Sequence, residues 1–247
     1  MTTPPPFPVP PFPGAVGVSH LRVYDSEAPD GLRGGTPHLH TVCTEAYVVI
    51  AGTGEGHTLS PGGFEVTPLV AGALVWFTPG TIHRLVNLDG RLEIVVLMQN
   101  AGLPEAGDMV ITFPDDVLAE PDRYRAEAAL AEGERTTAGP DDGARRRRDL
   151  GVQGFTALRA AFDEQGPAAL EALHRRVAVL VADHADRWRD VWAAGPKAAV
   201  DQTGRQLEAL AAGDARHLLD ASVHRLAPPG DERRFGCCGT LGTYLPN

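Results

Sequence analysis

Three side chains that could bind a metal stand close together in GGTPHLHTVCTEAYVVIAG, residues 34–52. His38 and His40 are two residues apart, so on a β-strand both side chains point to the same face. Glu45 follows five residues after His40 and begins the apolar run 45–50. A hairpin between the histidines and this run would bring Glu45 beside them.

His83 is a fourth candidate ligand, because it begins an apolar run after a Pro-Gly turn in GALVWFTPGTIHRLVN, residues 72–87. Three imidazoles and one carboxylate suit a divalent transition metal such as Fe, Mn, Ni, Zn or Cu. A metal that prefers five or six ligands keeps one or two positions open for substrate. One carboxylate leaves the site one net positive charge, which favours an anionic or chelating substrate oxygen.

The region that carries these residues, 16–113, is predicted to consist of short strands. Glycine-containing breaks separate the runs 47–50, 73–77, 85–88 and 92–98, which are rich in β-branched, leucine and aromatic residues. Many short, regularly spaced strands indicate an antiparallel sandwich or barrel. A barrel suits a metal site, because its inward residues converge on the axis. Asp89-Gly90 between two runs predicts a hairpin.

The flanking regions have a different texture. Residues 1–15 are predicted to be a proline-rich arm, because proline cannot join a sheet ladder. Residues 114–247 are predicted to be an α-helical extension with an irregular tail, and residues 133–148, with their arginine run, an exposed loop. The tail is apolar and rich in glycine, so we expect it to dock on the barrel mouth, the helices or a partner subunit. Helical periodicity and helix-start residues place the helices near 121–132, 155–164, 167–194, 197–212 and 214–226.

The ligand spacing resembles the two motifs of the cupin superfamily over residues 16–113. The first motif, His-x-His, three or four residues, Glu, six residues and Gly, is matched by His38, His40, Glu45 and Gly52. The second, Pro and Gly, two residues, His, three residues and Asn, is matched by Pro79, Gly80, His83 and Asn87. Leu32 replaces a motif glycine and Pro79 directly abuts Gly80, but every ligand is kept. The resemblance implies an antiparallel cupin, or jelly-roll, barrel; the helices resemble no family.

The resemblance also implies a metal-dependent enzyme acting on a small molecule, and a homodimer. Cupins include dioxygenases with three histidines and one glutamate, such as acireductone and quercetin dioxygenases, and zinc-type sugar-phosphate isomerases. We favour dioxygenase-type chemistry, because the barrel region has four arginines, no lysine and no glycine-rich phosphate loop. The alternatives are a zinc-type isomerase, a non-enzymatic small-molecule or metal-binding module, and a scaffold whose helices mediate assembly.

Some neighbours of the ligands are candidates for a role in the pocket. Tyr47 is two residues beyond Glu45, so it shares the inward face of a strand and could donate a hydrogen bond or a proton to substrate. For Tyr47, a place in the core is an equal alternative. Candidates for an apolar wall of the pocket are Val49, Trp76, Phe77 and Met98, although a plain core role is favoured for all four.

Composition excludes several classes of partner. The net charge is −10, and neither half of the chain is basic, which excludes nucleic acid and anionic lipid as main partners. No apolar run is long enough to span a bilayer, and the N-terminus lacks the features of a signal peptide. Three cysteines are too few for a disulfide framework, so we expect a cytoplasmic protein.

Overall fold

A computed structural model describes residues 12–244 of the chain. Most of the predicted proline-rich arm, residues 1–11, lies outside the described residues. The strands are β1 (Gly17–Val23), β2 (His38–His40), β3 (Glu45–Ala51), β4 (Thr53–Ser60), β5 (Gly63–Val70), β6 (Leu74–Phe77), β7 (Ile82–Asn87), β8 (Glu93–Met98), β9 (Met109–Ile111), β10 (Arg234–Phe235) and β11 (Gly239–Thr243). The α-helices are α1 (Asp115–Leu118), α2 (Pro121–Ala128), α3 (Asp142–Gln165), α4 (Pro167–Val181), α5 (Ala185–Trp192) and α6 (Ala198–Ala211).

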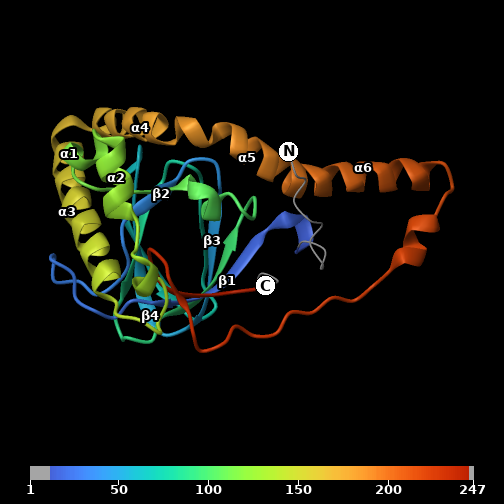
Figure 1. The fold of residues 1–247 in the computed structure, drawn as a ribbon, viewed down its shortest axis with the longest axis horizontal. Helices are drawn as coiled ribbons and strands as arrows, with labels where there is room; N and C mark the ends of the chain where they lie inside the picture. Colours follow the sequence, from blue (N-terminus) through green and yellow to red (C-terminus); the bar gives the residue numbers. More distant parts are fainter. Residues whose placement is uncertain (1–11, 245–247) are drawn as a thin grey trace.

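The strands form two facing sheets, and every pairing is antiparallel. One sheet has the order β10-β11-β1-β8-β3-β6 and the other β5-β4-β7-β2-β9. From β1 to β8 the chain alternates between the sheets, except at the β4–β5 hairpin, and this is the path of a jelly roll. The predicted fold class, an antiparallel jelly-roll barrel followed by an α-helical region, is confirmed (Figure 1).

Two predicted hairpins are wrong, because the turns lead from one sheet to the other. Asp89 and Gly90 connect β7 of the five-stranded sheet to β8 of the six-stranded sheet. The turn between His40 and Glu45 likewise connects β2 to β3 across the barrel. Gly90 has a φ of 72°, a left-handed conformation that glycine adopts without strain. Local turn chemistry therefore located the corners but not the partners of the strands.

The barrel interior is filled by alternate residues of the strands. Along β3, Glu45, Tyr47 and Val49 are buried, whereas the intervening residues are more exposed. Side chains of a strand point alternately to the two faces of its sheet, so one face supplies the interior. The interior cluster comprises Leu21, Val23, Tyr47, Val49, Leu69, Phe77, Leu85, Leu92, Ile94, Val96 and Cys238.

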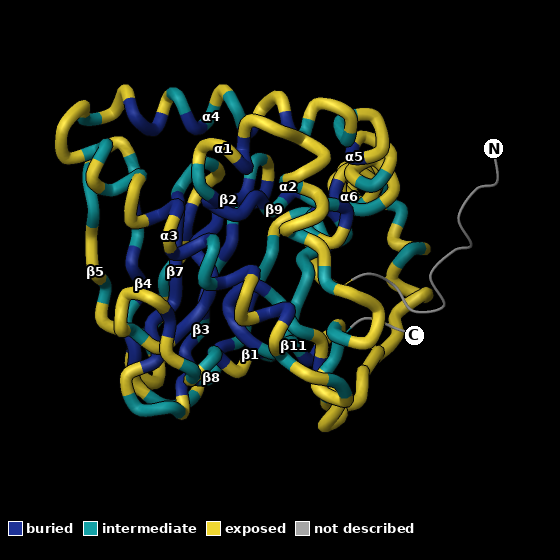
Figure 2. Tube along the Cα trace, turned by 60° about the vertical axis from the view of Figure 1, so that its left-hand side comes forward, coloured by how far each residue is buried: buried dark blue, intermediate teal, exposed yellow. Residues whose placement is uncertain are grey.

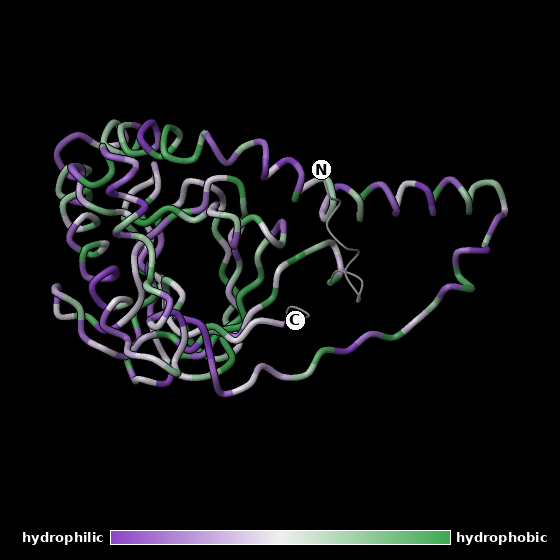
Figure 3. The backbone as a smooth tube through the Cα atoms, viewed as in Figure 1, coloured by the Kyte–Doolittle hydropathy of each residue, from purple (hydrophilic) through white to green (hydrophobic). Residues whose placement is uncertain are grey.

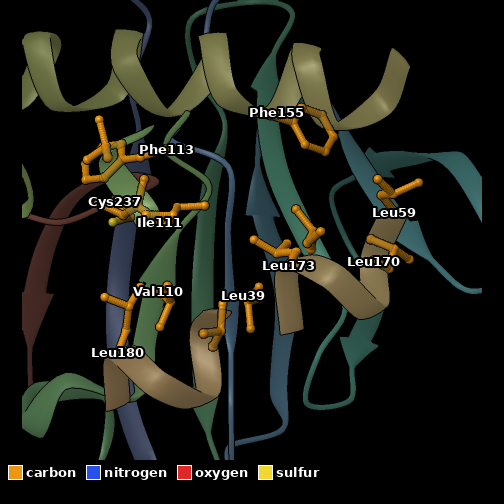
Figure 4. Packing of buried hydrophobic residues seen from close by; sticks show 14 residues of the cluster. Leu39, Leu59, Val110, Ile111, Phe113, Phe155, Leu170, Leu173, Leu180 and Cys237 are labelled. Carbon is orange, nitrogen blue, oxygen red and sulfur yellow. The ribbon is translucent and has the colours of Figure 1, made fainter. Parts of the chain in front are cut away.

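Helices α3 and α4 cover the outer face of the five-stranded sheet (Figures 1 and 4). On α4, Leu170, Leu173, Val177 and Leu180 recur every three or four residues and are buried. They pack against outward side chains of the sheet, such as Leu39 of β2. The helices alternate between hydrophobic and hydrophilic residues, as expected when one helix face is buried (Figure 3). The buried strands lie beneath this more exposed layer (Figure 2).

Residues 142–148 belong to helix α3, so the prediction of an exposed loop at 133–148 is wrong for its second half. Arg148 is 2% exposed and donates to the backbone oxygens of Ser26 and Glu27 at 2.8 and 2.7 Å. Arg147 donates to the backbone oxygen of Gly236 at 2.7 Å. These acceptors lie about a hundred residues away in the chain, so the local charge pattern could not reveal the buried role of the arginines.

Gly154 marks the closest approach of α3 to the chain after β9, and it supports a first prediction. A Cβ atom there would lie 2.2 Å from the Thr112 carbonyl oxygen and 2.4 Å from the Phe113 carbonyl carbon. Because both are backbone atoms, we expect Gly154→Ala to lower the free energy of unfolding by about 1–3 kcal/mol.

The matched control is Gly204→Ala in α6, where nothing lies within 4 Å of the added Cβ. Alanine is the better helix former, so this change should raise the free energy of unfolding by up to about 1 kcal/mol. Urea denaturation of both variants measures the difference. Equal effects of the two substitutions would contradict the packing of α3.

The C-terminal tail is more regular than expected, because its last part extends the barrel. β11 pairs with β1, and Val23 lies opposite Gly239. Just before β11, the Cys237 backbone oxygen accepts a hydrogen bond at 2.9 Å from the backbone of Thr36, which precedes β2. The Cys238 backbone oxygen accepts one at 3.2 Å from the backbone of Tyr24, which follows β1. The tail therefore joins the two sheets, with Cys237 packed under the helices and Cys238 inside the barrel.

The C-terminal helices extend beyond the barrel. The helix expected at 167–194 is observed as α4, a short turn and α5. Helix α6 continues away from the barrel and buries none of its residues (Figure 1). The helix expected at 214–226 is only a 3-10 turn, Arg216–Asp220. Within residues 12–244, no helix combines the length and the apolar character needed to cross a bilayer.

Candidate metal centre

The structure brings together the four side chains singled out as metal ligands. His38 and His40 come from β2, His83 from β7 and Glu45 from the first position of β3. His38 pairs directly with His83 across the five-stranded sheet, and Glu45 faces them from the other sheet. One nitrogen or oxygen atom from each residue lies within 4.8 Å of all the others, and the four residues are only 2–6% exposed.

Each imidazole is oriented by a hydrogen bond at its Nδ1 atom. Nδ1 of His38 lies 2.8 Å from the Thr36 backbone oxygen, and Nδ1 of His83 lies 3.1 Å from that of Thr81. Nδ1 of His40 lies 3.2 Å from a carboxylate oxygen of Asp108. These partners only accept hydrogen bonds, so each Nδ1 carries a proton. In the neutral rings, every Nε2 atom therefore presents a lone pair.

The Nε2 lone pairs converge with a carboxylate oxygen, and this arrangement fits a cation. Nε2 of His38 and Nε2 of His83 are 3.1 Å apart, and Oε2 of Glu45 lies 2.8 Å from His83 Nε2 and 3.4 Å from His40 Nε2. Despite these short distances, Oε2 of Glu45 is buried without a hydrogen bond of acceptable geometry. Acceptors directed at one point repel one another unless a positive charge lies between them. The donor set and its arrangement thus fit a transition metal.

The charges of the site shift the pKa values of its members. Burial alone would lower the pKa of His40, but the carboxylates of Asp108 and Glu45 raise it to about 9, so without a metal this ring holds a second proton that a bound metal would replace. Burial and the neighbouring imidazoles His83 and His40 hold the pKa of His38 well below its usual value. For Glu45, burial favours the neutral acid, yet His83 and His40 lower its pKa well below the usual range. The carboxylate is therefore ionised and ready to bind a cation.

Asp108 is the residue of the candidate site that sequence reasoning missed. It is completely buried and contacts His40, although 68 residues separate the two in the chain. It stands in the sequence EAGDM, outside both motifs, and no periodicity or spacing relates it to the ligands. Only the folded chain reveals that this carboxylate belongs to the site.

Tyr47, the proposed catalytic residue, lies inside the barrel beside the ligands. Its ring packs edge-on against Phe77 and His83, with centroid distances of 5.2 and 6.2 Å. Its hydroxyl is 3.9 Å from Sγ of Cys238. Burial, with the thiol of Cys238 and the carboxylate of Glu45 nearby, raises the pKa of Tyr47 well above its usual value. The phenol therefore keeps its proton and remains a hydrogen-bond donor.

Three of the four candidates for the apolar wall lie inside the barrel. Val49 and Phe77 are buried in the barrel, and Met98 packs against the same cluster. Phe77 stacks on the His83 ring, with centroids 4.8 Å apart and planes 6° from parallel, and so fixes its orientation. Trp76 was wrongly assigned to the wall: it pairs with Ala46 on the outer face and is 64% exposed.

Comparisons with known proteins give partial matches only. One similar solved structure is a variant of PAC13 from Streptomyces with uridine, with 20% identity over 34% of this chain and 58% of that chain and a TM-score of 0.27. Another is KdgF from Halomonas sp., with 24% identity over 27% of this chain and 57% of that chain and a TM-score of 0.24. A third is an uncharacterized protein with a double-stranded beta-helix domain from Klebsiella pneumoniae (27%, 35% and 69%, 0.26). The chain spans just over half the length of the first two. No protein-family model and no curated protein sequence match it. The fold is therefore assigned from the strand order and the site.

Proposed function

We propose that this chain, a cupin-fold barrel, is a metal-dependent enzyme that acts on a small molecule, with dioxygenase-type chemistry favoured. His38, His40, Glu45 and His83 would hold one divalent transition metal, either Fe, Mn, Ni, Zn or Cu. The supporting observation is the convergence of one ring nitrogen from each histidine and one Glu45 oxygen within 4.8 Å, with every Nδ1 atom hydrogen-bonded to another group.

A redox metal held there would supply open positions for a substrate oxygen and dioxygen, whereas zinc would act as a Lewis acid. The residues of the chain would prepare the site for either use. Glu45 neutralises one of two positive charges, which leaves an attraction for an anionic or chelating substrate oxygen. Tyr47 would donate a hydrogen bond or a proton to bound substrate, because its phenol stays protonated. Phe77 and Met98 would exclude water.

The positions of the barrel arginines support a substrate without phosphate. Residues 16–113 contain four arginines and no lysine. Arg22 contacts Glu93, Arg84 pairs with Asp30, and Arg91 pairs with Asp89, while Arg33 is exposed. Arg84 also donates to the Gly35 backbone oxygen, away from the ligands. None of these four arginines forms a hydrogen bond or an ion pair with a candidate ligand, which favours an oxygenase over a zinc-type sugar-phosphate isomerase.

Elemental analysis of the freshly purified full-length protein tests this proposal. One redox metal per chain is the expected result, and one zinc per chain would instead favour the isomerase. After the metal is removed with a chelator, adding it back should again give one bound metal per chain. A protein that contains no metal as purified and binds none when metal is added would contradict the metal centre. The Fe(II)-loaded protein exposed to nitric oxide, a stand-in for dioxygen, should give the electron paramagnetic resonance signal of a nitrosyl complex. If the Fe(II)-loaded protein gives no such signal, oxygenase chemistry is contradicted, and a non-enzymatic metal-binding module remains as the alternative.

The homodimer and the cytoplasmic location stay predictions. Ile50, Leu74 and Trp76 on the outer face of the six-stranded sheet are 45–64% exposed, and so much apolar surface supports association. The three cysteines are free and buried, consistent with a reducing compartment. Sedimentation velocity measures the oligomeric state, and a monomer at all concentrations would contradict the predicted homodimer.

A further inference from the structure

Asp108 occupies a fixed position at the end of η2, the π-helical turn Pro104–Asp108. The turn packs in a small core where Leu103 and Ala106 meet Trp188 of α5. The indole Nε1 of Trp188 also donates to the Ala106 backbone oxygen at 3.1 Å. Gly107, with a φ of 100°, allows the sharp bend that precedes Asp108. The helical extension therefore packs directly on the turn that carries this carboxylate.

Both oxygens of Asp108 are fully used by the short segment between two metal ligands. Oδ1 accepts from the Thr41 backbone at 2.9 Å, the Thr41 hydroxyl at 2.5 Å and the Val42 backbone at 2.8 Å. Oδ2 accepts from the Cys43 backbone at 3.1 Å and from His40 Nδ1 at 3.2 Å. One side chain thus fixes both the His40 ring and the turn that leads to Glu45.

We infer that Asp108 is a positioning residue for the metal centre, which keeps the His40 proton on Nδ1 and sets the spacing between His40 and Glu45. This inference rests on the proposed metal site. Nε2 can bind a metal only when the ring proton lies on Nδ1, and an acceptor beside Nδ1–H favours that tautomer. Asp108 supplies that acceptor, and α5 holds it in place through Trp188.

An asparagine at position 108 would replace one of the two accepting oxygens by a hydrogen-bond donor. Its amide group has one oxygen and one NH₂ group, so one side of the former carboxylate becomes a donor. Placing the NH₂ group at Oδ1 would oppose three donors, whereas at Oδ2 it opposes two, of which one is His40 Nδ1–H. The second orientation costs less, so Nδ1–H of His40 loses its acceptor and the Nε2-ligating tautomer is disfavoured.

The test compares Zn²⁺ affinity and the absorption spectrum of the Co²⁺-substituted protein for the wild type, Asp108→Asn and Asp149→Asn. Asp149 is the matched control, because it pairs with Arg148 on α3 and forms no hydrogen bond with a candidate ligand. We expect Asp108→Asn to weaken Zn²⁺ binding about 10–100-fold and to change the Co²⁺ spectrum, which reports the number and kind of ligands. Asp149→Asn should change neither.

A second variant keeps the test decisive if Asp108→Asn folds poorly. Trp188→Phe removes the indole donor to Ala106 and leaves Asp108 itself intact, so Zn²⁺ affinity should fall in the same direction but less. The inference is overturned if the wild type binds Zn²⁺ and Asp108→Asn has the same affinity and the same Co²⁺ spectrum. If Asp108→Asn is unfolded, the same result in Trp188→Phe overturns it. Wild type that binds neither metal would instead overturn the proposed centre.

Discussion

Replacing His83 by alanine is expected to abolish stoichiometric metal binding. The substitution removes the Nε2 atom that lies 3.1 Å from Nε2 of His38 and 2.8 Å from the Glu45 carboxylate. Three ligands would remain, and the lost imidazole would leave a gap beside the ring of Phe77. The loss of affinity should exceed the roughly 10–100-fold typical of losing only an outer partner of a ligand. Elemental analysis and Zn²⁺ titration measure it.

His57→Ala is the matched control for this experiment. His57 lies in β4, which pairs with β7 beside His83, but its ring faces outward, bonded to Glu55 at 2.8 Å and packed on Phe64. The control should therefore keep one metal per chain. If His83→Ala also keeps its full metal content, the ligand assignment is wrong, and the proposed chemistry loses its basis.

Replacing Gly239 by valine is expected to detach the C-terminal tail and to destabilise the whole barrel. A Cβ atom at this position would lie 2.0 Å from the Arg22 carbonyl oxygen and 2.8 Å from the Val23 Cα atom. Since β1 is held by β8 on its other edge, β11 is the strand that must move. Its movement would withdraw Cys237 and Cys238 from two cores, so the free energy of unfolding should fall by about 3–5 kcal/mol.

Thr243→Val, at the far end of the same strand, is the control, because Thr243 is exposed and valine suits a strand. Urea denaturation of both variants measures the effect. Detachment of the tail would also remove Cys237 and Cys238 from their buried positions. Their thiols should therefore react faster with a water-soluble thiol reagent. Equal stability of the two variants, with both thiols still protected, would show that the tail is dispensable.

The sequence by itself predicted the four candidate ligands and the class of the fold. His38, His40 and Glu45 are close in the chain, so their strand parity and spacing are local properties that a pattern can carry. The apolar runs between glycine-containing turns likewise indicated the strands, and the period of α4 its buried face. These features depend on neighbours within a few residues, and the structure brings all four ligands together.

Tertiary structure alone decided which strands pair and which distant residues complete the site. Asp89-Gly90 has the chemistry of a hairpin, yet the jelly-roll path sends its flanking strands to different sheets. Asp108 reaches His40, Arg147 reaches the Gly236 backbone and Cys238 reaches Tyr47 across 68, 89 and 191 residues. Such contacts arise because folding a chain into two facing layers makes remote segments neighbours, and no local periodicity records which segments those will be.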